Sequence, residues 1–218
     1  MRYALYWAPP PDDPLWQQGC AWLGRDAATG AHVPQPDIPN IAALTEDARH
    51  YGLHCTLRAP MRLATDEHKL ASSIRKIAET MHSFALPPLT LRSVDGFLSL
   101  TLTASCPEMR TLADQCVRET DHHRLPASPK ELARRRATGL KPRQETMLRR
   151  WGYPYVMDDW LFHITLTRRL SSSELAEILP EAQSWFAPLL NLPRLVDGIC
   201  IFVQCEGDFV ITERIGFG

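Results

Sequence analysis

Two copies of a His-x-Thr-Leu motif carry the residue types best suited to chemistry. HCTL begins at His54 and HITL begins at His163. An imidazole gains or loses a proton near neutral pH, so two facing imidazoles can serve as general base and general acid. The threonines at 56 and 165 share a strand face with their histidines, where a hydroxyl can donate to a phosphate oxygen. We therefore expect His54 and His163 to be catalytic, and Thr56 and Thr165 to bind the substrate.

Each motif lies in a run that alternates polar and apolar residues, as a half-buried strand does. In GLHCTLR (52–58), Arg58 falls on the face of the histidine, and in LFHITLTRRL (161–170) Thr167 does so. A guanidinium can make a charge-assisted contact with a phosphate. We therefore add Arg58 and Thr167 to the expected substrate-binding residues.

The order of elements recurs in the two halves of the chain. In each half, a motif-bearing strand precedes a capped helix and then two strands. RSVDGF at 92–97 also matches RLVDGI at 194–199. Two matches in the same order favour duplication over chance. Duplicated lobes that face each other across a pseudo-two-fold axis would bring the two motifs together.

The remaining elements follow from periodicity and caps. Asp66 is expected to cap the first long helix, Ser171 and Glu174 to form a capping box, and Pro180 to kink or divide the helix that follows. We expect an irregular excursion over 10–48, with one helix near 40–50. The expected strands are 2–8, 52–58, 88–95, 97–104, 161–170, 194–204 and 208–216, and the expected helices are 66–84, 107–121 and 130–150, the last broken at Gly139 and Pro142.

These elements predict an α+β fold with two pseudo-symmetric lobes. Each lobe would have a mostly antiparallel sheet with outer helices, and the active-site cleft would lie between them. We expect one two-lobed domain over 1–218, with the first motif in a lobe of about 45–125, a basic helical segment at about 126–151, and the second motif in a lobe of about 155–218.

The paired motifs resemble the signatures of the 2H phosphoesterase superfamily, which includes RNA 2′,3′-cyclic phosphodiesterases and RNA-ligase-like proteins. RYALYWAP, YGLHCTLRAP and WGYPYVMDDWLFHITLTRRL resemble its bacterial branch associated with phosphonate catabolism. The resemblance covers nearly the whole chain. It implies a two-lobed fold, a cleft without metal or cofactor, and active-site roles for His54, Thr56, His163 and Thr165. It also implies a small cyclic or linear phosphodiester as substrate, such as a ribose cyclic phosphate.

The charge balance bears on the expected partners. A net charge of −1 gives no general attraction for nucleic acid, so a small phosphorylated substrate is favoured over RNA. The basic segment 130–150 is interpreted first as a solvated helix face, and second as a rim that attracts the substrate. Tyr3, Tyr6, Tyr153 and Tyr155 either line the cleft or pack in the core.

The chain has no apolar run of about 18 residues that would cross a bilayer, so no membrane partner is expected. Its six cysteines show no zinc-like spacing and are interpreted as reduced thiols of a cytoplasmic protein. Asp121-His122-His123 spells the motif of a metal-binding phosphoesterase family, but no companion aspartate motif precedes it and we reject that interpretation. The oligomeric state is not predicted.

Two alternatives remain beside the small-molecule phosphodiesterase. One is an RNA-end 2′,3′-cyclic phosphodiesterase or RNA ligase, which would bind RNA in a strongly salt-dependent way. The other is a protein that binds a phosphate ligand without turnover, for which replacing either histidine would change only affinity.

Overall fold

The computed structural model describes residues 1–204 and 207–218. Its described strands form a sheet of seven and a sheet of two, and every neighbouring pair is antiparallel. The strands are β1 (Arg2–Trp7), β2 (Cys55–Met61), β3 (Phe84–Leu86), β4 (Leu89–Val94), β5 (Phe97–Leu102), β6 (Ile164–Arg169), β7 (Arg194–Val196), β8 (Gly198–Gln204) and β9 (Phe209–Gly216). The large sheet has the order β4-β5-β6-β2-β1-β8-β9, and β3 pairs with β7. The predicted α+β class with antiparallel sheets is confirmed.

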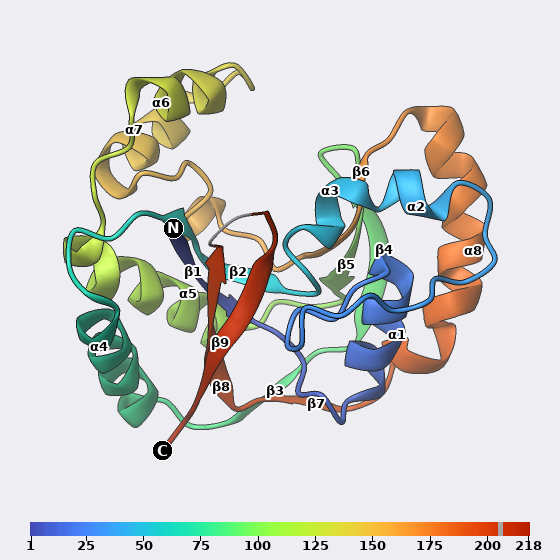
Figure 1. Cartoon of the computed structure of the whole chain (residues 1–218), viewed down its shortest axis with the longest axis horizontal. Coiled ribbons are helices and arrows are strands. Elements are labelled where there is room, and N and C mark those ends of the chain that lie inside the picture. Colours follow the sequence, from blue (N-terminus) through green and yellow to red (C-terminus); the bar gives the residue numbers. More distant parts are fainter. Residues whose placement is uncertain (205–206) are drawn as a thin grey trace.

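Helices lie on both flanks of the large sheet, with α4 and α5 beside one part and α1 and α8 beside another (Figure 1). The helices are α1 (Pro14–Leu23), α2 (Ile41–Leu44), α3 (Glu46–Arg49), α4 (Glu67–Thr80), α5 (Pro107–Thr120), α6 (Pro129–Arg136), α7 (Pro142–Trp151) and α8 (Ser172–Leu190), and the short 3₁₀ turns are η1 (Asp121–His123) and η2 (Met157–Asp159). The Asp66 carboxylate accepts from the Lys69 N–H, and Ser171 forms the expected capping box. α8 runs unbroken through Pro180, so of the two predicted effects, a kink or a division, this proline does not cause the division.

The excursion over 10–48 contains a helix that the sequence prediction missed. Asp13 caps the N-terminus of α1, Pro14 occupies the first turn, and Gly24 ends the helix with a φ of 79°. A proline at the start and a left-handed glycine after the end are common helix boundaries. Its apolar face packs on β6, where the Trp22 indole N–H donates to the Leu166 carbonyl at 3.0 Å.

The strands of the two repeat halves interleave within one sheet, where we expected a sheet for each lobe. The first-half hairpin β4-β5 lies beside β6, which follows the second motif. The second-half hairpin β8-β9 lies beside β1, which in turn pairs with β2. The two motif-bearing strands are therefore central neighbours, and each half supplies an outer hairpin to the other.

The matching segments 92–97 and 194–199 adopt different local structures. Asp95 and Gly96 both have positive φ and close the tight β4-β5 hairpin, as a two-residue primed turn requires. The matching residues Asp197 and Gly198 connect β7 to β8, which pair with other strands. Sequence similarity at this position therefore does not extend to strand pairing.

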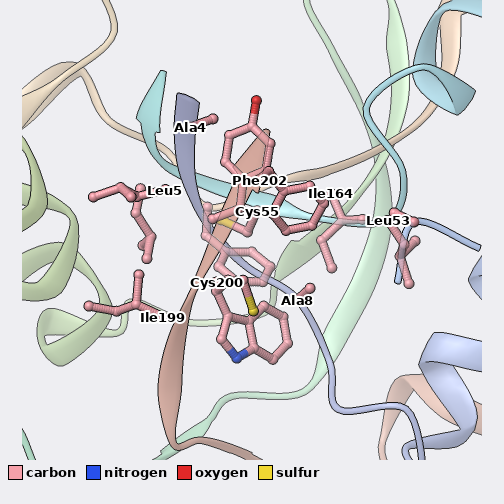
Figure 2. Packing of buried hydrophobic residues seen from close by; sticks show 14 of the residues in the cluster. Ala4, Leu5, Ala8, Leu53, Cys55, Ile164, Ile199, Cys200 and Phe202 are labelled. Carbon is pink, nitrogen blue, oxygen red and sulfur yellow. The ribbon is translucent and has the colours of Figure 1, made fainter. Parts of the chain in front are cut away.

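Apolar side chains from neighbouring strands form the core beneath the motifs (Figure 2). β1 is buried along nearly its whole length, since it lies between β2 and β8. Leu53, Cys55 and Ile164 are fully buried next to the two histidine positions. Alternation along a strand thus places an apolar residue inside the core between each histidine and its threonine.

No helix in the described residues is long and apolar enough to cross a bilayer. Five of the cysteines are unpaired and buried: Cys20, Cys55, Cys106, Cys116 and Cys200. Cys205 lies outside the described residues.

Candidate active site

The two motifs meet because the strands that follow them pair directly. β2 and β6 are in register at the residue that separates histidine from threonine in each motif. Since the strands are antiparallel, this register sets His54 opposite Thr165 and Thr56 opposite His163. Alternate residues share a face, so the four side chains project to the same side of the sheet. All four line one cleft.

The imidazoles are held in matching ways. The Nδ1 atom of His54 lies 2.9 Å from the carbonyl oxygen of Gly52, and that of His163 lies 2.9 Å from the carbonyl oxygen of Leu161. In both cases the carbonyl belongs to the residue two positions earlier. A carbonyl only accepts, so each Nδ1 carries the proton and each Nε2 is left for a ligand in the cleft. The local geometry of the repeat is therefore preserved at its two histidines.

The environment of His54 disfavours its charged form. Its ring stacks on Tyr6 with 3.9 Å between ring centroids. Burial lowers the pKa of His54 to about 4, an effect opposed by the Gly52 carbonyl and reinforced by the charge of nearby His163. His54 is therefore neutral at neutral pH, and its Nε2 can accept a proton.

The two threonine hydroxyls are available to a ligand. Thr56 and Thr165 are half-buried in the cleft, and neither hydroxyl has a hydrogen-bond partner in the part of the chain that the structure describes. Neighbouring strands flank them in a similar way, since Tyr6 pairs with Thr56 and Ser99 pairs with Thr165. The Trp160 indole N–H donates to the Thr56 carbonyl at 2.7 Å and fixes the backbone there.

Arg58 does not reach the cleft, contrary to the expectation from strand alternation. The register of β2 with β1 shifts between Thr56 and Arg58, which is an irregularity of the β-bulge type. Such a bulge reverses the alternation, so Arg58 turns to the opposite face. Its side chain is 3% exposed, and it binds Asp121 at 2.8 Å and the Val117 carbonyl at 3.2 Å.

Thr167 lines the cleft, as strand alternation predicts, but its hydroxyl already has a partner. The Thr167 hydroxyl lies fully buried at the base of the cleft and accepts from the Leu98 N–H at 3.0 Å. Its hydroxyl is therefore engaged within the sheet, whereas those of Thr56 and Thr165 are not.

The cleft has a volume of about 960 Å³ and extends well beyond the two motifs. Tyr6, Tyr153 and Tyr155 line it, as the sequence allowed, whereas Tyr3 is absent from its lining and bonds to Glu67. Residues that the sequence analysis did not place in the site also line it: Arg2, Asp47, His50, Tyr51, Asp95, Phe97, Ser99, Asp159, Leu161 and Arg169. A sequence signal existed for Ser99, which lies in the alternating strand predicted at 97–104.

The Asp121-His122-His123 tripeptide has a structural role. Asp121 of η1 binds Arg58 and Arg124, and His123 is buried between the hydroxyls of Thr65 and Ser73. Across the described residues, no three His, Cys, Asp or Glu side chains come together as a metal-ligand cluster.

Solved structures of low sequence identity align with nearly the whole chain. Escherichia coli LigT in complex with 3′-AMP is 12% identical, covers 99% of this chain and 97% of its own, and has a TM-score of 0.49. A structure described as a phosphoesterase is 13% identical, with coverage of 99% and 97% and a TM-score of 0.46.

Curated relatives are more similar in sequence. "Ribose 1,5-bisphosphate phosphokinase PhnN" of Janthinobacterium sp. (strain Marseille) is 37% identical over 99% of this chain and 51% of its own length. The protein of the same name from Laribacter hongkongensis (strain HLHK9) is 36% identical over 94% of this chain and 49% of its own length. The chain thus spans about half the length of these relatives.

A family model matches residues 56–210, which extend from the threonine of the first motif past the whole of the second. The chain therefore belongs to the family described as protein of unknown function (DUF1045).

Proposed function

We propose that this chain is a phosphodiesterase that hydrolyses a small, cyclic phosphodiester with His54 and His163 as its acid–base pair. The observation that carries the proposal is the matched pair of imidazoles, each with its Nδ1 bonded to the carbonyl two residues earlier. Each Nε2 then shares one cleft with the unpartnered hydroxyls of Thr56 and Thr165. A phosphoryl group bound between the imidazoles would have one imidazole on each side.

In the proposed reaction, His54 is the general base and His163 is the general acid. The Nε2 atom of neutral His54 takes a proton from water as the water oxygen bonds to phosphorus. The bond from phosphorus to the leaving ribose oxygen breaks, and His163, which enters this step with a proton on each ring nitrogen, gives its Nε2 proton to that oxygen. The threonine hydroxyls donate to non-bridging oxygens, where negative charge increases. Each proton transfer contributes about 10²- to 10⁴-fold in rate.

The names of the relatives support a ribose phosphate as the substrate class. The chain has no G-x-x-x-x-G-K-[ST] phosphate loop and matches only half of each relative, so we do not carry the kinase activity over to it. A kinase of that name acts on ribose 1,5-bisphosphate. Hydrolysis of the bond between phosphorus and O2 in a ribose 1,2-cyclic phosphate leaves a 1-phosphate. A 1-phosphate is one of the two phosphate groups of ribose 1,5-bisphosphate. We place the reaction in the cytoplasm, where five unpaired cysteines would stay reduced.

Turnover of a small substrate panel in EDTA tests the proposal. The panel contains ribose 1,2-cyclic phosphate, nucleoside 2′,3′-cyclic phosphates and an RNA ending in a cyclic phosphate. We expect EDTA-resistant hydrolysis of the ribose ester that His54→Ala or His163→Ala each reduces at least about 10²-fold. His68→Ala, at an exposed position of α4, is the matched control and should retain full activity.

Three outcomes would contradict parts of the proposal. Loss of activity in EDTA would contradict metal independence, and preference for the RNA would replace the small substrate. Retention of activity in both active-site variants would contradict the acid–base pair. Ligand binding without turnover of any panel member would favour a binding protein.

A further inference from the structure

Four arginines line the same cleft as the two histidines: Arg2, Arg134, Arg135 and Arg169. Arg134 and Arg135 come from α6, in the basic segment between the two motifs, and Arg2 comes from β1. α6 and α7 lie together at one end of the molecule, apart from α1 and α8 (Figure 1). One helix of the basic segment therefore contributes positive charge to the cleft.

Some arginines of this basic segment form ion pairs and others do not. Arg136 and Arg149 both pair with Glu145, at 2.8 and 2.7 Å. In the part of the chain that the structure describes, Arg134 and Arg135 have neither an ion pair nor a hydrogen bond. Two arginines that do not line the cleft are thus neutralised within the segment, whereas the two that line it are left for another anion.

Arg135 is held in the cleft wall by aromatic contact. Its guanidinium lies 4.6 Å from the ring centroid of Tyr153, and its side chain is half-buried. Burial lowers the pKa of Arg135, an effect that nearby Tyr153 partly opposes. A buried cation without an anionic partner is unfavourable, so an anionic ligand here would replace lost solvation.

The arginines lie close to the catalytic pair. Arg2, Arg135 and Tyr6 all line this cleft, and the charges of Arg2 and Arg135 both act to lower the pKa of Tyr6, which burial raises. The Tyr6 ring in turn stacks on His54. Tyr51 also lines the cleft, and its ring centroid lies 6.0 Å from that of His54. The positive region therefore adjoins the reacting centre on the side of His54.

We infer that Arg2, Arg134 and Arg135 form a second anion subsite, which binds a terminal phosphate monoester on the phosphodiester substrate. Guanidinium groups match phosphate oxygens in geometry and charge, and a dianionic monoester suits several cations better than a single carboxylate does. The inference rests on the proposed function and narrows its substrate to a small sugar bearing two phosphoryl groups. The ring phosphodiester lies between the histidines, and the monoester lies against α6.

A matched pair of substrates tests this subsite. We would measure kcat and KM for ribose 1,2-cyclic phosphate with and without a 5-phosphate. Wild type should prefer the 5-phosphorylated substrate by at least about tenfold in kcat/KM, mainly through KM. Arg135→Gln and Arg134→Gln should each reduce that preference. Lys130→Gln, an exposed change on the same helix, should keep the wild-type preference.

Binding of ribose 5-phosphate, measured by calorimetry, separates failure of the subsite from failure of the proposed function. Ribose 5-phosphate lacks the phosphodiester, so its binding does not depend on turnover. Wild-type binding that Arg135→Gln abolishes would support the subsite, even without hydrolysis of either ester. Equal kcat/KM for the two substrates, or binding that survives both arginine substitutions, would overturn it. An arginine-dependent preference for an RNA end over both sugars would also overturn it, in favour of RNA.

Discussion

Burial of His54 determines the acid side of the pH profile that we expect. With its pKa lowered to about 4, His54 stays neutral at pH values where a free imidazole, with a pKa of about 6.5, is charged. The kcat/KM profile should therefore fall on its acid side near pH 4. NMR titration of the His54 ring should give the same midpoint, and His163→Ala should raise it by removing a nearby charge. An acid limb near pH 6.5 would contradict this prediction.

The same shift has a consequence for stability. Because the pKa of folded His54 lies below that of the unfolded chain, the unfolded chain binds the proton first as the pH falls. His54 therefore reduces the free energy of unfolding as the pH falls from roughly 6.5 to 4, and it has no such effect above pH 6.5.

Substitution of Thr56, Thr165 and Thr167 should distinguish hydroxyls that bind the substrate from one that stabilises the sheet. Thr56→Val and Thr165→Val keep the side-chain shape and remove the hydroxyl. A hydrogen bond to a charged phosphate contributes about 1.5–3 kcal/mol, so each change should reduce kcat/KM by roughly 10- to 100-fold. Thr167→Val, two residues further along β6, is the matched control. It removes the acceptor of the Leu98 N–H, so it should reduce the free energy of unfolding by about 1 kcal/mol.

Five of the six expected site residues line one cleft, and the exception, Arg58, has a clear physical cause. The spacing of His54 to Thr56, and of His163 to Thr165, is too short for a bulge to intervene. Arg58 lies beyond a register shift that only the partner strand reveals. Alternation predicts a face only as far as the next bulge, and a bulge depends on pairing with a strand that is distant in sequence.

At the scale of elements, the ion pair between Arg58 and Asp121 joins β2 to the end of α5. Asp121→Ala would leave the buried Arg58 guanidinium without its anion, which should reduce the free energy of unfolding by about 3 kcal/mol. Arg58→Met should be milder, because Asp121 keeps Arg124 as a partner. Chemical denaturation measures both effects, and kcat/KM should stay near wild type in both variants. A large loss of kcat/KM in stably folded Arg58→Met would contradict the structural role.

Local signals were enough for most helices and strands. The Asp66 cap and the capping box at Ser171 mark helix starts in the sequence and in the structure. The same kind of signal was present at Asp13, Pro14 and Gly24, so α1 was predictable and was missed because the surrounding segment is rich in proline and glycine. In α8, an apolar face packed on the protein outweighs the effect of a proline within the helix.

At the scale of the whole molecule, strand order is what the sequence could not indicate. The repeat predicted two similar halves, but an outer hairpin pairs with whichever edge buries its apolar face best. Here β4-β5 adds to the second-half strand β6, and β8-β9 adds to β1 beside β2. The position of α6 beside the cleft likewise depends on tertiary packing, because its sequence suits a solvated helix equally well.

Interleaving of the halves predicts that they unfold together. Neither half can leave the sheet without breaking strand pairs of the other, so chemical denaturation should give one transition. Tryptophans report on both halves, with Trp7 and Trp22 buried in the first and Trp160 in the second. Tryptophan fluorescence and far-ultraviolet circular dichroism should therefore give the same midpoint. Two separated transitions would instead mean that the halves are independent units, in which case β2 and β6 would part before the rest of the sheet unfolds.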